Sequence, residues 1–170
     1  MRKNTLSKSD RGFTLLELMV VLFLIGIMAA IASPNFFGLL ERIKVNTSLE
    51  QLLGAIRETQ RLAMRRGKRC QINIDPDTNM ITATPNSCLL NTRKIDNSVI
   101  IKTNLPGSNP NIYFSHKGNT TRMGTIILSS DSTKTQKCFV ISLGLGIMRT
   151  GDYTGRRDER ISHKKCIGNK

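Results

Sequence analysis

The sequence predicts an α+β fold, in which one long N-terminal hydrophobic helix packs on a mostly antiparallel β domain. Three observations support this prediction. Residues 13–32 are almost wholly apolar, residues 49–63 place apolar side chains at three- and four-residue steps, and short β-type runs separated by turn residues follow Gly67. A chain of 170 residues is long enough for one such domain with a modest core.

The apolar run at 13–32 reads FTLLELMVVLFLIGIMAAIA and is interrupted only by Thr14 and Glu17. A helix of this length extends about 30 Å, which is the thickness of a bilayer's hydrocarbon core. The leader at 1–12 carries four basic residues and one acidic residue, so the positive-inside rule keeps it in the cytoplasm. We therefore expect a transmembrane helix over 13–34, with the rest of the chain exported.

Two ordinary explanations of this segment are open. A conventional secretory signal would be cut after Ala30-Ile31-Ala32, which resembles a small-residue cleavage site and would leave a chain that begins at Ser33. A plain membrane anchor would explain the length of the run. An intramembrane Glu17 costs about 2.5 to 3.5 kcal/mol or more, and a plain anchor supplies no partner for it.

The stretch from Arg11 to Glu17, RGFTLLE, with the apolar run and Pro34-Asn35 after it, resembles the class III signal of type IV prepilins. The resemblance implies that a prepilin peptidase cuts between Gly12 and Phe13 and that the new amino terminus at Phe13 is methylated. It also implies an assembly role for Glu17. In physical terms, the Glu17 carboxylate of one subunit can neutralise the terminal amine of another, so that two charges costly in lipid are satisfied together.

The helix is expected to continue over 35–66 as an amphipathic segment, and a β-rich globular domain is expected over 67–148. The apolar stripe of the helix would lie against a sheet. The expected strands are Gln71–Asp75, Met80–Thr84, Ser98–Thr103, Asn111–Ser115, Thr125–Ser129, Cys138–Leu143 and Gly146–Arg149. A basic C-terminal tail is expected over 149–170.

The globular region also resembles the minor pilins of the GspH/FimT group. The similarity lies in an F-x-x-x-G segment that begins at Phe114 and in a V-I-S-x-G-x-G-I segment that begins at Val140. This resemblance implies a type IV pilin-like fold. Some members of this group bind DNA during natural transformation through a C-terminal Gly-Arg-x-Arg element.

The four cysteines all follow the apolar run, in a compartment where disulfides persist. Four cysteines allow three pairings. Cys70 opens and Cys88 follows one predicted hairpin, so we expect those two to be close. Cys138 in a late strand is then left to hold Cys166 near the carboxyl end. A metal site built from His163 and Cys166 is the alternative, but His116 is the only other histidine.

The basic charge of the chain favours polyanionic partners, since 26 Lys+Arg against 12 Asp+Glu give a net charge of +14. After loss of the leader a side-chain net charge of +11 remains. One basic cluster lies at the end of the helix and comprises Arg57, Arg61, Arg65, Arg66, Lys68 and Arg69, and its helical stripe is also typical of a solvated face. The other is the tail, with Arg149, Arg156, Arg157, Arg160, Lys164 and Lys165.

The tail is the candidate DNA-binding site. Arginine presents a planar fork to phosphate oxygens, glycines such as Gly151 and Gly155 allow close backbone approach, and Tyr153 could stack on a base or sugar. The tail resembles the Gly-Arg-x-Arg element only in part, because Asp158 replaces its final arginine. The prediction of DNA binding therefore depends on the general basic charge of the tail and not on a match to the strict motif.

Catalytic motifs are lacking in the sequence. It contains no His pair at helical spacing, no P-loop and no nucleophile elbow, and Gly144-Leu145-Gly146 lacks the third glycine of a dinucleotide fingerprint. We expect no enzyme, no cofactor and no metal.

Taken together, the residues and the resemblance predict a minor type IV pilin. It would enter the inner membrane as a single-pass protein with its globular domain in the periplasm, and would then assemble with other pilins into or at the tip of a pilus. Double-stranded DNA is a candidate partner. The alternatives are a minor pseudopilin of a type II secretion system and a membrane-anchored exported binding protein.

Overall fold

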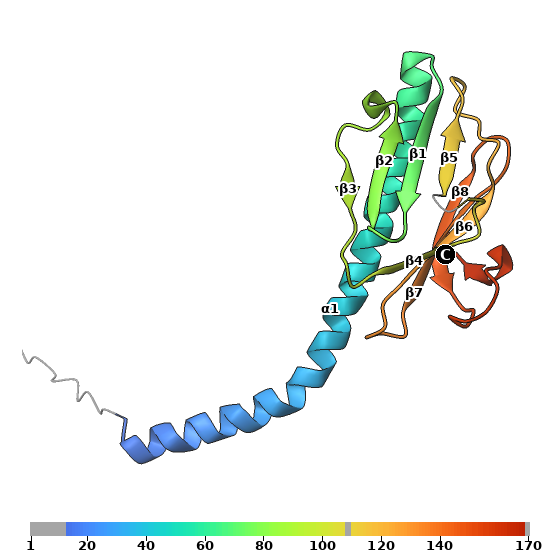
Figure 1. The fold of residues 1–170 in the computed structure, drawn as a ribbon. Coiled ribbons are helices and arrows are strands. Elements are labelled where there is room, and N and C mark those ends of the chain that lie inside the picture. Colours follow the sequence, from blue (N-terminus) through green and yellow to red (C-terminus); the bar gives the residue numbers. More distant parts are fainter. Residues whose placement is uncertain (1–12, 108–109, 169–170) are drawn as a thin grey trace, which may run out of the picture. The chain divides into compact units, whose positions relative to one another are not determined.

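The computed structural model describes residues 13–107 and 110–168, with the side chains of 31–35 left out. In these residues one α-helix, α1 (Leu15–Arg66), is followed by nine strands and two short 3-10 helices, η1 (Asn86–Cys88) and η2 (His163–Lys165) (Figure 1). The chain divides into two compact units, Met1–Phe37 and Gly38–Lys170, so α1 contributes to both. The predicted leader and the predicted scissile residue Gly12 lie outside the described residues.

Both ends of α1 are fixed by local signals in the sequence. At its start the Thr14 hydroxyl accepts a hydrogen bond of 3.2 Å from the Glu17 N–H, which is the first half of a capping box. At its end Gly67 has a φ of 63°, and the N–H groups of Gly67 and Lys68 donate to the carbonyl oxygens of Met64 and Ala63. This is a Schellman motif, and the left-handed residue that it needs explains the glycine.

The strands of the second unit form two antiparallel sheets. The four-stranded sheet has the order β3-β2-β1-β5, and the five-stranded sheet has the order β4-β6-β7-β8-β9. Their bounds are β1 (Cys70–Asp75), β2 (Met80–Thr84), β3 (Arg93–Lys94), β4 (Ile100–Thr103), β5 (Asn111–Phe114), β6 (Gly124–Ser129), β7 (Gln136–Ile141), β8 (Met148–Tyr153) and β9 (Cys166–Ile167). The α+β prediction is confirmed, and only β3 and β9 are additional to the predicted strands.

The hydrophobic core lies between α1 and both sheets. The buried side chains of α1 recur at three- and four-residue steps and include Val45, Leu49, Leu52, Leu53, Ile56 and Ala63. They share one cluster with alternate residues of the strands, such as Ile72 on β1 and Phe139 on β7. The amphipathic stripe predicted for the helix is therefore its packing face. Gln60, on the same part of α1, is half-buried and donates to the Gly118 carbonyl oxygen at 2.9 Å.

Two disulfides close the second unit, with the pairing that the order of the strands predicts. Cys70 pairs with Cys88, across 18 residues, and Cys138 pairs with Cys166, across 28 residues. Cys138 and Cys166 are buried in a second small cluster with Ile127, Val140 and Tyr153. The carboxyl end is thus held against the five-stranded sheet by a covalent bond, by β9 and by apolar packing.

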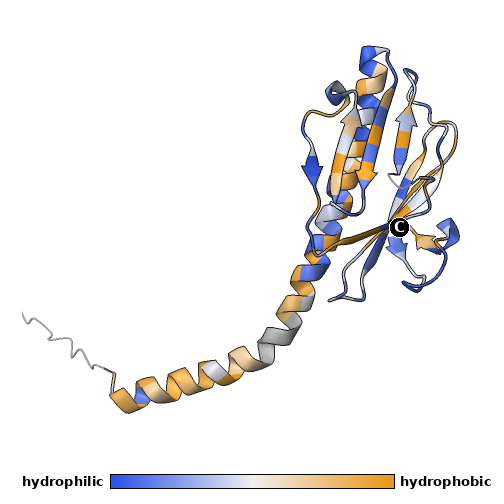
Figure 2. Cartoon of the chain, in the orientation of Figure 1, coloured by the Kyte–Doolittle hydropathy of each residue, from blue (hydrophilic) through white to orange (hydrophobic). Residues whose placement is uncertain are grey.

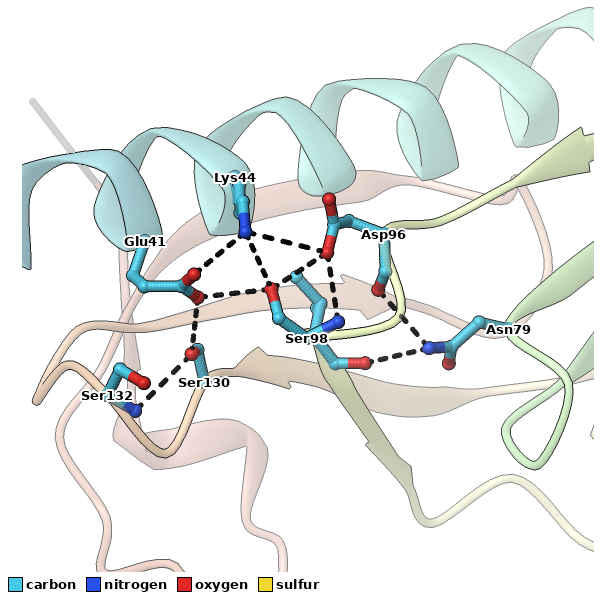
Figure 3. A network of polar contacts seen from close by, with 8 residues as sticks. Glu41, Lys44, Asn79, Asp96, Ser98, Ser130 and Ser132 are labelled. Atoms are coloured by element: carbon cyan, nitrogen blue, oxygen red, sulfur yellow. Dashed lines mark hydrogen bonds and ion pairs between the residues drawn. The ribbon is translucent and has the colours of Figure 1, made fainter. Parts of the chain in front are cut away.

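A polar network joins α1 to the loops at one end of both sheets (Figure 3). The Glu41 carboxylate accepts hydrogen bonds from the Lys44 ammonium at 2.8 Å, the Ser130 hydroxyl at 2.7 Å and the Ser98 hydroxyl at 3.1 Å. These donors hold the pKa of Glu41 below its ordinary value, with the Lys44 contact the largest cause. The network fixes the position of the helix against the sheets in a way that no motif in the sequence indicates.

Candidate assembly helix and candidate nucleic-acid interface

The first half of α1 presents apolar side chains to its surroundings on every side. Figure 2 shows mostly hydrophobic residues along the beginning of the helix, where Leu16 is 75% exposed and Phe23 is 70% exposed. A soluble protein rarely exposes a continuous apolar surface of this size. This part of α1 therefore requires an apolar environment that the described chain does not itself provide.

Glu17 is the one carboxylate in this apolar part of the helix, and it is exposed. It forms no ion pair with any other residue that the structure describes. It lies in the first turn, where a negative charge interacts favourably with the helix dipole. Phe13 comes four residues earlier, so a Glu17 carboxylate and a terminal amine at residue 13 would belong to one short segment. The segment can therefore carry both of the charges that the assembly hypothesis pairs between subunits.

No helix among the described residues has the combined length and apolar character expected of a membrane crossing.

The predicted basic tail, 149–170, is largely an integral part of the five-stranded sheet. Its first residues complete β8, and its last described residues form β9, which pairs with β8 through Asp152 and Ile167 and through Tyr153 and Cys166. A boundary at 148/149 thus falls inside a strand. The sequence could not show this because β9 contains only two residues, too few for a periodic signal.

Three of the six basic residues predicted to bind DNA are engaged within the protein. The Arg157 guanidinium pairs with Asp131 at 3.0 Å and donates to the Ser130 carbonyl oxygen at 2.5 Å. The Arg149 guanidinium donates to the His163 carbonyl oxygen at 2.7 Å, and the Lys165 ammonium pairs with Glu159. These contacts give the three cations structural partners and reduce their availability to a polyanion.

Tyr153 does not have the role predicted for it. Its side chain is only 5% exposed, in the cluster around the Cys138–Cys166 disulfide, and its hydroxyl accepts a hydrogen bond of 3.1 Å from the Ser162 N–H. The ring is therefore not accessible for stacking on a base. The alternation along β8 directs it inward, and the glycine at 151 hides that alternation in the sequence.

The two glycines of the tail are also explained by packing. A Cβ at Gly151 would lie 1.9 Å from the carbonyl oxygen of Ile167, and a Cβ at Gly155 would lie 2.5 Å from the Tyr153 ring. Both positions are buried. Their small size allows β9 and the tyrosine to approach, so the prediction that they bring the backbone close to a phosphodiester is wrong.

Three cations of the tail are exposed and form no hydrogen bond or ion pair through their side chains with other described residues: Arg156, Arg160 and Lys164. The basic face of α1 is similar, because Arg57, Arg61 and Arg65 are all exposed and unpaired among the described residues. The tail therefore retains a smaller candidate interface than the sequence predicts, and the helix face agrees with a solvated surface.

Sequence reasoning missed one further group of basic residues. Arg69 and Arg122 both lie over the ring of Tyr113, on the outer side of the four-stranded sheet. Arg122 is separated from Arg69 by more than fifty residues and belongs to neither predicted cluster. The only signal available in the sequence was the lack of Asp and Glu in the segments around them.

These features define a class of protein: a chain with a prepilin-type N-terminus, an exposed apolar helix and a disulfide-linked antiparallel domain. The prokaryotic N-terminal methylation motif matches residues 7–33. In this N-terminal segment the chain is similar to prepilins, the class that includes type IV pilins and pseudopilins. The sequence-based identification is confirmed at this level.

Several known proteins are similar in part. The type IV major pilin protein PilA of Myxococcus xanthus is 47% identical over 58 residues, which cover 32% of this chain and 26% of PilA. A fimbrial protein of Pseudomonas aeruginosa is 35% identical over 69 residues, covering 41% of this chain and 44% of that protein. The type II secretion system core protein G of Klebsiella pneumoniae is 47% identical over 50 residues, covering 28% of this chain and 36% of that protein. The matches thus span less than half of each relative.

Among solved structures, the minor pseudopilin EpsH from the type 2 secretion system of Vibrio cholerae is similar, with a TM-score of 0.46 and 17% sequence identity. The alignment covers 66% of this chain and 96% of the EpsH chain.

Proposed function

We propose that the protein is a minor type IV pilin. A prepilin peptidase cuts it between Gly12 and Phe13, the new terminus is methylated, and the apolar part of α1 holds the chain in the inner membrane before assembly. The globular unit faces the periplasm during this stage. Other pilins then bury the same helix in or at the tip of a pilus.

The observation that carries this proposal is Glu17, which lies within an exposed apolar helix and inside the matched methylation motif and forms no ion pair with the other described residues. A carboxylate in an apolar environment needs a cationic partner. A methylated terminal amine remains positively charged, so Phe13 of a neighbouring subunit supplies one. This pairing needs a bundle of identical or related helices, which is what a filament provides.

A minor pseudopilin of a type II secretion system is the second candidate, and the similarity to core protein G of such a system favours it. A membrane-anchored binding protein that keeps its leader or is cut at Ser33 is the third. In each case the role is structural or binding rather than catalytic.

We further propose that the exposed cations of the tail bind double-stranded DNA weakly and with little sequence preference. Arg156, Arg160 and Lys164 support this role because they are free to contact phosphates. They offer no element that would enter a groove and read base edges.

Intact-mass measurement of the protein from its own membrane tests the processing step. A chain that begins at Phe13 and carries one methyl group supports the proposal, and a start at Ser33 contradicts it. Recovery in sheared surface pili distinguishes a pilus subunit, whereas retention in the periplasm with secretion components indicates a pseudopilin.

A further inference from the structure

Two arginines converge on one outward-facing tyrosine of the four-stranded sheet. Tyr113 points away from the core, because its neighbours Ile112 and Phe114 on β5 are fully buried. The guanidinium carbon of Arg69 lies 4.1 Å from the centre of the Tyr113 ring, and that of Arg122 lies 5.4 Å away. Cation–π attraction holds both groups at the ring. The pairing of Gln71 with Tyr113 brings the residue before β1 beside β5.

Neither guanidinium has a carboxylate partner among the described residues. No Asp or Glu occurs between Thr59 and Ile74 or between Asn97 and Ser130, the segments that supply the cluster. Each guanidinium carries five N–H donors, and no contact within the described chain satisfies those of Arg69 or Arg122. Two like charges held at one ring repel each other, so an anion bound close to them would relieve this repulsion.

The cluster borders a surface pocket of about 320 Å³ that carries further hydrogen-bonding groups. Its lining comprises Arg69, Tyr113, Ser115, His116, Asn119 and Thr121. The wall at 115–119 is a turn fixed to α1, because Gln60 donates to the Gly118 carbonyl oxygen at 2.9 Å. Gly118 has a φ of 79°, and a Cβ there would lie 2.7 Å from the Met64 sulfur. The turn is therefore packed closely on the helix and forms a preorganised wall.

We propose that this pocket binds a phosphate group. Guanidinium forks match phosphate oxygens in geometry and charge. Arg69 lines the pocket and can bind the phosphate directly, and Arg122, over the same tyrosine ring, adds positive charge beside it. The hydroxyls of Ser115 and Thr121 and the Asn119 amide can bind a polar group attached to the phosphate. The volume is at the lower end of the range for small-ligand sites. The site is separate from the tail and does not rest on the proposed pilin function.

The phosphate can belong to a small phosphorylated molecule or to the backbone of a nucleic acid. Both present the same oxygens to Arg69 and Arg122. An experiment with three probes, namely inorganic phosphate, ribose 5-phosphate and a 12-nucleotide DNA duplex, separates these sources.

Tyrosine emission gives a direct readout, because the chain has two Tyr and no Trp, and Tyr153 is buried. The full-length protein in a non-ionic detergent is titrated with inorganic phosphate at constant ionic strength. We expect a saturable change in emission that persists in Tyr153→Phe. The double variant Arg69→Gln/Arg122→Gln should weaken binding roughly tenfold or more, as expected for the loss of charge-assisted hydrogen bonds.

Arg57→Gln/Arg61→Gln is the matched control, since it removes the same charge from an exposed face without an aromatic ring. It should change the dissociation constant by less than about twofold. Equal weakening in both double variants, or a response that does not saturate, would overturn the proposal. Arg69→Lys/Arg122→Lys keeps the charge without the fork and should bind less tightly than the parent; parental affinity in this variant would also overturn it.

The source of the phosphate follows from competition experiments. If ribose 5-phosphate displaces inorganic phosphate and DNA does not, the ligand is a small phosphorylated molecule. If DNA displaces inorganic phosphate, and still does so in the variant Arg156→Gln/Arg160→Gln/Lys164→Gln, the nucleic acid is bound at the pocket itself. Either result supports the site.

Discussion

The guanidinium of Arg157 lies 3.0 Å from the carboxylate of Asp131 and also donates to the carbonyl oxygens of Ser130 and Thr133. It thereby joins the segment after β8 to the loop between β6 and β7. Arg156 next to it is exposed and Arg160 three residues later is too. Within this short segment, Arg157 has a structural role, whereas Arg156 and Arg160 are available to a ligand. The number of basic residues in the sequence does not distinguish these two roles.

Arg157→Gln should affect the stability of the protein, whereas the triple variant Arg156→Gln/Arg160→Gln/Lys164→Gln should affect its binding to DNA. Loss of Arg157 should lower the free energy of unfolding by about 1–2 kcal/mol, because a carboxylate and two carbonyl groups lose a charged donor that is partly exposed. The triple variant should keep its stability. If each of its three cations contacts one phosphate of DNA, it should flatten the dependence of log K on log salt by about 2.7.

Chemical denaturation and DNA titrations at several salt concentrations measure these two quantities at matched pH. A triple variant with the salt slope of the parent would show that the tail is only a solvated surface. If Arg157→Gln keeps the stability of the parent and strongly reduces the salt dependence of DNA binding, Arg157 binds DNA and does not have the structural role proposed for it.

Glu17→Ala should impair assembly while leaving export and processing intact. The variant removes the partner of a neighbouring subunit's terminal amine and leaves that amine uncompensated, an effect large enough to reduce recovery in a filament fraction by at least about tenfold. Quantitative detection in sheared filaments, compared with total membrane protein, gives the measurement. Glu50→Ala removes an exposed carboxylate from the same helix and should assemble normally. Equal recovery of the two variants would argue against pairing at Glu17.

Sequence periodicity was sufficient for the long elements of this fold. The stripe that contains Leu52 and Ile56 predicted the packing face of α1, and β2 was predicted with its observed bounds. The short strands β3 and β9 were missed because two residues carry no periodic signal. These strands form through their neighbours, β9 beside the Cys138–Cys166 disulfide.

The details of the candidate sites depend on register and therefore could not be predicted. Whether Tyr153 faces the core or the solvent is decided by the pairing of β8 with β7 and β9. In the same way, Arg69 reaches Tyr113 because of the register between β1 and β5. The N-terminal features could be predicted, because Phe13 and Glu17 belong to one continuous sequence motif that can be recognised without knowing the tertiary structure.

Removal of the Cys138–Cys166 disulfide should release the carboxyl end from the sheet. In the chain-entropy description, a closed loop of 28 residues contributes about 3–4 kcal/mol, so Cys138→Ser/Cys166→Ser should be less stable by that amount. Trypsin should then cut early after Arg156, Arg157 or Arg160. Cys70→Ser/Cys88→Ser loses a loop of 18 residues and a similar free energy, but should leave the tail protected. Mass spectrometry of the first tryptic fragments distinguishes the two variants, and early tail cleavage in both would contradict the assigned anchoring role.

The network at Glu41 should make the stability of the globular unit sensitive to acid. The pKa of Glu41 lies below its ordinary value of 4.5, chiefly through the hydrogen bond from Lys44, and that of Asp96 lies below 3.8 through the Ser98 N–H. The folded state therefore binds protons less readily than the unfolded state. The stabilisation is complete above the unfolded values and is lost as the pH falls through the lower folded values.

We accordingly expect an unfolding temperature that changes little between about pH 7 and pH 5 and falls progressively below about pH 4.5. The pKa of Lys44 is raised by the Glu41 contact, so its contribution is complete below 10.5 and is lost only as the pH rises through its higher folded value. Glu41→Gln should be less stable than the parent at pH 7, and the difference should shrink on acidification because the parent's carboxylate becomes protonated.

Asp75→Asn provides the comparison, since the pKa of Asp75 is also lowered, by the Thr78 hydroxyl within a local turn rather than by a contact with α1. Both variants should flatten the acid limb of the stability curve, but only Glu41→Gln should increase hydrogen exchange at residues 41–48 of α1 and in the loop around Ser130. Protection of these segments in Glu41→Gln equal to that in Asp75→Asn would show that the carboxylate of Glu41 does not hold the helix to the sheets.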